Sequence, residues 1–210
     1  MKPLIRFEMN SKKGESFLET LLDKVGGKYN YIVLLKLAFF ADRYHIRNYA
    51  RPVGADYYLA MRHGAVPSNL KDILESKCLF EDNIQKDKEY IITLKSSENI
   101  DKTQFSTSDI EAIDFAIEKF SKVGSNDIWN LPDLCHAYPE WIEYKDQFNG
   151  DNKNNSYDMN FLDFLKNANP NHPDFKKLNF TDPFTPLTDL DRKDLTEEIQ
   201  EVNNLYGEDS

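Results

Sequence analysis

Residues 29–47 constrain the fold of this chain more than any other segment, because they have the pattern of a helix that is apolar on two sides. The apolar side chains recur at helical spacing in two stripes, Ile32, Leu35 and Phe39 in one and Leu34, Leu37, Ala38 and Ala41 in the other. A helix with two apolar faces has to be covered by other elements on both. We therefore expect 29–47 to form a hub helix at the centre of a largely helical domain.

The segments around this hub helix predict further helices and a few short strands. Apolar spacing and end signals indicate helices at 15–25, at 68–75, and from a capping box at Ser108–Glu111 to a stop at Gly124. Aromatic or alternating runs indicate strands at 57–61 and 89–95, the second paired with 78–81, and we expect 63–69 to be a tight loop. The predicted fold class is α+β, mainly helical, with a small antiparallel sheet.

The chain divides by charge near residue 146. The net charge is −10, and residues 146–210 hold 14 Asp or Glu against 6 Lys or Arg. A polar run of turn-forming residues lies between the two parts. We predict a compact domain at 1–145, a polar linker at 146–157, and an acidic, partly helical C-terminal extension at 158–210.

Composition and motifs exclude several function classes. The acidic balance disfavours general nucleic-acid binding, and the longest apolar stretch is too short to span a bilayer. Cys78 and Cys135 form neither a disulfide framework nor a metal knuckle, so we expect a cytoplasmic protein. The sequence has no phosphate-binding glycine loop and no nucleophile elbow. We therefore predict no metal, no cofactor and no membrane partner.

Two groups of polar residues on the hub helix are candidate sites. Lys36, Phe40, Arg43 and Arg47 share one side of the helix, which we expect to reach solvent or a partner. This cationic face is either a solvated surface neutralised by acids of the domain or a recognition surface, since Arg and aromatic residues are common at interface hot spots. Asp42 and His45 are three residues apart, so they fit either structural hydrogen bonding or acid–base catalysis.

Two stretches of the sequence resemble a known family. The run LKLAFFADRYHIRNYARPVGADYYLAMRHGAVPSNL at 35–70 and the run LCHAYPEW at 134–141 are similar to motifs of the SocA-like antitoxin or Panacea domain. The similarity extends over about 27–145 and leaves the acidic extension outside. Ala65 departs from the proline that the family usually has, which would loosen that loop slightly.

The resemblance implies an antitoxin that neutralises a cognate toxin, encoded by an adjacent gene in a prokaryote or phage, through direct protein–protein binding. One alternative is a proteolytic adaptor that delivers the toxin to an ATP-dependent protease. A cryptic hydrolase that uses Asp42 and His45 is another. For an antitoxin, we expect the toxin to contact the exposed face of the hub helix and the loops at its end. The candidate toxin-binding residues are Phe40, Arg43, Arg47, Tyr49 and Arg51, followed by Arg62 and His63.

Overall fold

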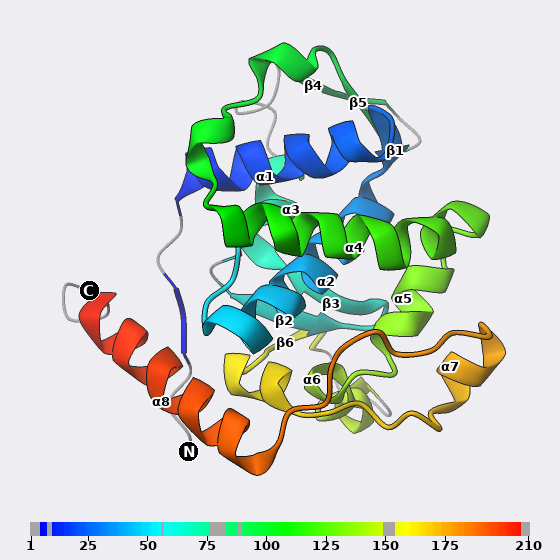
Figure 1. The fold of residues 1–210 in the computed structure, drawn as a ribbon. Helices are drawn as coiled ribbons and strands as arrows, with labels where there is room; N and C mark the ends of the chain where they lie inside the picture. The colour runs from blue at the N-terminus through cyan, green and yellow to red at the C-terminus, as the bar shows by residue number, and fades with distance from the viewer. Residues whose placement is uncertain are drawn as a thin grey trace.

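A computed structural model describes residues 5–7, 10–55, 57–75, 83–87, 90–148 and 154–206 of the chain. Its central element is helix α2 (Tyr31–Tyr49), which is the predicted hub displaced by two residues (Figure 1). Asn30 caps its first turn by accepting a hydrogen bond from the Ile32 N–H at 2.9 Å. The helix ends at Ala50, whose backbone is left-handed with φ 55°. Its residues from Val33 to Phe40 are all buried, as expected for a hub.

Two long helices pack beside α2, and the other helices complete the shell (Figure 1). The long neighbours are α1 (Ser11–Lys24) and α4 (Thr107–Asn126). The remaining helices are α3 (Ser68–Glu75), α5 (Asn130–Cys135), α6 (Pro139–Ile142), α7 (Pro173–Lys177) and α8 (Asp189–Tyr206), with 3₁₀ turns η1 (Ser97–Asn99), η2 (Lys102–Gln104), η3 (Lys145–Phe148) and η4 (Phe161–Leu165).

The described strands form two small antiparallel sheets. One has the order β1-β5-β4 and the other the order β3-β2-β6. The strands are β1 (Lys28–Asn30), β2 (Tyr58–Met61), β3 (Gly64–Pro67), β4 (Ile84–Lys86), β5 (Ile91–Leu94) and β6 (Ser156–Asp158). The predicted class, mainly helical α+β with a small antiparallel sheet component, is confirmed.

Two local predictions about the strands need correction. The segment predicted as a loop at 63–69 contains strand β3, which pairs with β2 through a turn at Arg62 and His63. Strand β5 pairs with β1 and β4. The predicted pairing with 78–81 falls outside the described residues.

Helix α4 begins and ends differently from the prediction. Its N-cap is Ser106, which forms a capping box with Asp109, so the predicted box at Ser108 and Glu111 is wrong by two residues. Gly124 lies inside the helix and does not end it. The reason is packing, because a Cβ on Gly124 would lie 2.4 Å from a methyl group of Val33. Glycine therefore allows α4 to approach α2 closely.

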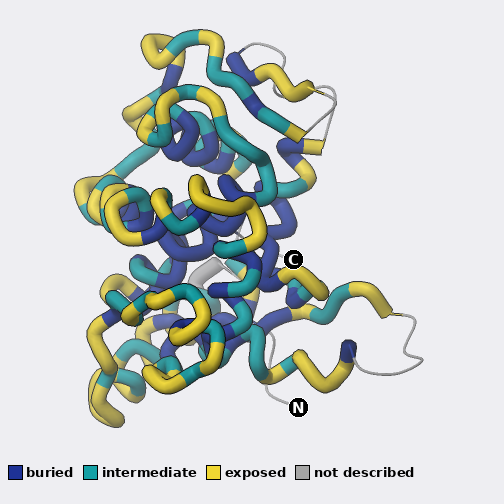
Figure 2. Tube along the Cα trace, turned by 90° about the vertical axis from the view of Figure 1, so that its right-hand side faces the viewer, coloured by how far each residue is buried: buried dark blue, intermediate teal, exposed yellow. Residues whose placement is uncertain are grey.

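The C-terminal segment, which we predict as an acidic extension beyond a domain at 1–145, packs onto the same core cluster as the rest of the chain. Strand β6, which spans the boundary between the predicted linker and the predicted extension, adds to the sheet of β2. Beyond it, the core includes Met159, Phe161, Phe164, Leu165, Phe175, Phe184 and Ile199. Figure 1 shows this segment, coloured yellow to red, running along one side of the molecule to α8. In Figure 2 buried residues gather in the interior of the tube trace, and exposed residues are frequent at its periphery.

Candidate functional site

The cationic face of the hub helix is buried, so the expectation that it reaches solvent is wrong. Lys36 is 1% exposed, Phe40 and Arg43 are 0% exposed, and Arg47 is 4% exposed. The Phe40 ring stacks on that of Phe120 in α4, with centroids 3.8 Å apart. The Lys36 ammonium donates to the Ala65 carbonyl at 2.5 Å, and burial lowers its pKa to about 8.

Arg43 forms an ion pair in the interior. Its Nη1 lies 2.6 Å and 2.7 Å from the two carboxylate oxygens of Glu140, which is also 0% exposed. The same nitrogen donates to the carbonyl of Phe164 at 3.1 Å. The Tyr138 ring adds a cation–π contact at 4.6 Å. Burial raises the pKa of Glu140, and the positive charge of Arg43 opposes that rise.

Arg47 binds the backbone of the C-terminal segment. Its guanidinium donates to the carbonyls of Phe164 and Lys166, both at 3.0 Å, and to the Thr185 carbonyl at 2.8 Å. Burial, together with the positive charge of Arg43, lowers its pKa to about 10. The two arginines therefore supply donors for carbonyls that have no partner in a regular helix or sheet. The face predicted to recognise a partner recognises this chain's own segment.

Asp42 and His45 hold different parts of the fold. One Asp42 oxygen accepts from the Val53 N–H at 2.6 Å, and the other accepts from the Tyr58 hydroxyl at 2.7 Å. The ring nitrogens of His45 contact the Arg51 carbonyl at 2.7 Å and the Ser108 hydroxyl at 3.0 Å. Burial raises the pKa of Asp42 to about 7 and lowers that of His45 to about 4. These contacts fit the structural alternative, because each side chain fastens a loop to α2.

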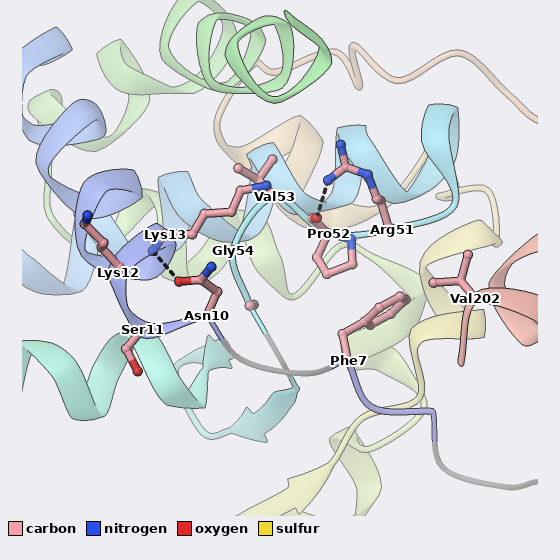
Figure 3. Close-up of a pocket in the computed structure, with 11 residues that line it drawn as sticks. Phe7, Asn10, Ser11, Lys12, Lys13, Arg51, Pro52, Val53, Gly54 and Val202 are labelled. Carbon is pink, nitrogen blue, oxygen red and sulfur yellow. Dashed lines mark hydrogen bonds between the residues drawn. The ribbon is translucent and has the colours of Figure 1, made fainter. Parts of the chain in front are cut away.

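Tyr49 and Arg51 remain accessible at the C-terminal end of α2. Tyr49 is 37% exposed and donates to Glu111 at 2.7 Å. Arg51 contacts Asp109 at 3.1 Å and lines a cavity of about 740 Å³ (Figure 3). Figure 3 shows this cavity between the start of α1 and a second wall that includes Phe7 and Val202. The cations on its α1 wall, Lys12 and Lys13, are paired with Asp101 and Asp109 respectively.

Arg62 and His63 lie in the turn between β2 and β3, near the other end of α2. Both are exposed. The His63 ring lies 5.1 Å from the ring of Trp129, which is 45% exposed. Sequence reasoning missed Trp129 because it lies next to a short helix, where periodicity does not distinguish an exposed ring from a buried one. The predicted toxin-binding residues are therefore divided among the interior and two separate surfaces.

The geometry defines a mainly helical domain in which a hub helix is held by buried polar contacts and leaves two surfaces at its ends. The sequence model of the SocA-like antitoxin, Panacea domain, matches residues 34–142, and the chain belongs to this family. The predicted resemblance over about 27–145 is thereby confirmed. Searches among curated proteins and among solved structures gave no match.

The described residues also bear on metals and membranes. Among them, no group of three or more His, Cys, Asp or Glu side chains is placed to hold a metal ion. Within the same part of the chain, every helix is too short or too polar to cross a bilayer.

Proposed function

We propose that this protein is an antitoxin that neutralises a cognate toxin in the cytoplasm by binding it directly. The single observation that carries the proposal is family membership over residues 34–142. The structural roles of Asp42 and His45 support binding over the cryptic hydrolase, because each side chain is committed to hydrogen bonds within the fold. The toxin is expected to be encoded by an adjacent gene.

The accessible candidates for toxin contact are Tyr49 and Arg51 at one end of α2 and Arg62 and His63 at the other. Phe40, Arg43 and Arg47 are buried, and we expect them to support toxin binding indirectly. Their contacts hold the C-terminal segment and α4 in place. A toxin that reached them directly would first have to displace that segment. We therefore expect replacements of the buried three to lower stability and toxin protection together.

Co-expression with the adjacent reading frame tests the function. Expressed alone, the neighbour should arrest growth, and this chain should relieve the arrest and co-purify with the neighbour as a stable complex. If neither neighbouring frame is toxic, or if protection occurs without a complex, the proposal is wrong. Repeating the rescue in a host that lacks its ATP-dependent proteases separates blocking from delivery. Protection that disappears there would support the proteolytic adaptor.

A further inference from the structure

A groove of about 360 Å³ lies where the N-terminal end of α2 meets the β2–β3 turn and the residues before α5. Its apolar walls come from three separate parts of the chain. They include Tyr31, Ile32 and Leu35 from α2, Met61 and Val66 from the hairpin, and Trp129. Arg62 and His63, which sequence reasoning selected, stand on its rim. The groove thus combines an apolar floor with a polar edge, as ligand and peptide sites do.

The charge of this groove is opposite to that of the protein. The described residues that line it include Lys36, Arg62, His63 and Lys71 and neither Asp nor Glu, although the net charge of the chain is −10. Lys71 is paired with Glu75 at 2.5 Å, and Lys36 is bound to a carbonyl beneath the hairpin. Arg62 makes no ion pair with any described carboxylate and is exposed. Its guanidinium is therefore available to an acidic partner.

Two other cavities lack, among their described lining residues, an exposed cation that is free of a carboxylate partner. Each cation on the walls of the cavity in Figure 3 is paired with a carboxylate, Lys12 with Asp101 and both Lys13 and Arg51 with Asp109. The cavity beside α8 is lined by Asp191, Asp194 and Glu198. An acidic segment would be repelled from the second and would compete with existing ion pairs in the first. Charge complementarity selects the groove at Arg62.

Exposed aromatic and aliphatic side chains gather around the same groove. Trp129 and Ile128 are 45% and 41% exposed, and Tyr90, which stacks on Tyr31 of the groove wall, is 53% exposed. Exposed Trp, Tyr and Arg are the residue types that most often carry the energy of a protein interface. Exposure of several large apolar side chains around one cationic groove indicates a surface that a partner covers.

We propose that this groove is the toxin-docking site and that it takes a toxin segment in which an apolar side chain lies beside carboxylates. The proposal rests on the antitoxin function proposed above. Arg62 pairs with a carboxylate of the segment, since its planar guanidinium matches a carboxylate with two parallel hydrogen bonds. The apolar side chain enters between Trp129 and the α2 wall at Leu35. The toxin would exclude water from the Arg62–carboxylate pair and from the apolar contact at Trp129, and contacts without water at the centre of an interface contribute most to affinity.

The first experiment measures toxin affinity for matched variants of the full chain. Arg62→Glu should weaken binding to the toxin from the adjacent frame at least tenfold, and Trp129→Ala should do the same. The controls make the same chemical changes on exposed residues elsewhere, Lys102→Glu in η2 and Leu190→Ala in α8, and should stay within twofold of wild type. Circular dichroism and thermal melting check that each variant is folded.

The outcomes separate the docking proposal from the function. If wild type neither binds nor neutralises its neighbour, the antitoxin function fails, and the docking proposal fails with it. If wild type binds and folded Arg62→Glu and Trp129→Ala bind equally well, only the docking site is wrong. Should Trp129→Ala not fold, Arg62→Glu, a change in an exposed turn, decides alone. A concentration-dependent dimer of wild type that Trp129→Ala abolishes would instead assign the groove to a second copy and overturn the proposal.

A second experiment tests the chemistry of the segment. Synthetic 15-residue peptides that tile the toxin are titrated against the full chain. The peptides that bind should hold an aromatic or large aliphatic residue beside Asp or Glu, and replacing those acids by Asn or Gln should abolish binding. The charge-reversed chain Arg62→Glu should lose these peptides, while Lys102→Glu keeps them. Capture of basic peptides in their place would contradict the proposal.

Discussion

Arg43 is a charged residue in the interior of the molecule. The effect of replacing it on stability depends on its buried partner, Glu140. Removing one partner of a buried ion pair leaves the other charge without compensation, whereas removing both can be nearly neutral. Arg43 and Glu140 are each 0% exposed in their side chains, so neither charge has access to water. Arg43 also satisfies carbonyls of Phe164 and Lys166. It is therefore a structural residue of the hub.

Arg43→Met should lower the free energy of unfolding by about 3 to 5 kcal/mol, because Glu140 would keep a buried charge or have to take up a proton. The double variant Arg43→Met/Glu140→Gln should lose less than the sum of its two single variants. Urea denaturation of the four proteins at neutral pH measures this coupling. Strictly additive losses would mean that the two side chains do not act as a pair.

His45 makes stability depend on pH in a defined direction. Its pKa is about 4 in the folded chain against 6.5 for an unperturbed histidine, because burial disfavours its charged form. Below pH 6.5 the unfolded chain takes up a proton that the folded chain refuses. The stabilisation from this group is therefore complete above pH 6.5 and is lost as the pH falls from 6.5 to 4.

Between pH 7 and pH 5, wild type should lose up to about 2 kcal/mol more stability than His45→Gln. The comparison uses urea denaturation of both proteins at the two pH values. It isolates His45, because Asp42, whose raised pKa of about 7 favours folding as the pH falls, is present in both. Equal losses in the two proteins would show that His45 is not the group responsible.

Among the helices, the contact between α4 and α2 reverses the usual effect of replacing a helical glycine by alanine on stability. Alanine in place of a helical glycine usually stabilises by about 0.5 to 1 kcal/mol. At Gly124, however, the added methyl group would lie 2.4 Å from Val33 and 2.9 Å from Leu131. Both neighbours belong to packed helices of the core. The close approach of the helices therefore outweighs the gain in helix propensity.

Gly124→Ala should lower the free energy of unfolding by about 1 to 3 kcal/mol through overpacking. The neighbouring change Ser125→Ala is the control, because Ser125 is exposed and should shift stability by no more than about 0.5 kcal/mol. Thermal melts of both variants beside wild type measure the difference. A stabilised Gly124→Ala protein would show that the contact between α4 and α2 has room for the added methyl group and that close approach does not require glycine.

How far the elements could be predicted depended on their length and periodicity. The sequence located α2 and α3 within a few residues, because long or well-capped apolar patterns are specific to helices. It missed β3, whose small residues and proline are typical of loops. It also placed the arginines of α2 on a surface, since helical spacing identifies which residues share a side but not what covers that side. The cover comes from residues 164–185, more than 100 positions away.

The stability of the whole molecule depends on the C-terminal segment that covers α2. The core cluster continues from α2 through Phe161, Phe164, Phe175 and Phe184, all beyond residue 145. Burying each such ring contributes about 1.5 to 3 kcal/mol, so the four together are comparable to the entire stability of about 5 to 15 kcal/mol of a typical domain. Helix α8 adds less, since Ile199 is its one fully buried side chain among the described residues.

A chain that ends at Lys145 should therefore lose its cooperative thermal transition, because Arg43 and Arg47 would keep their charges without the carbonyls that they bind. A chain that ends at Leu187 keeps those carbonyls and the four rings, so it should melt cooperatively at a lower temperature than wild type. Near-ultraviolet circular dichroism and melting of both proteins provide the comparison. A native-like, cooperative transition in the chain ending at Lys145 would show that the first 145 residues fold without the segment packed against their arginines.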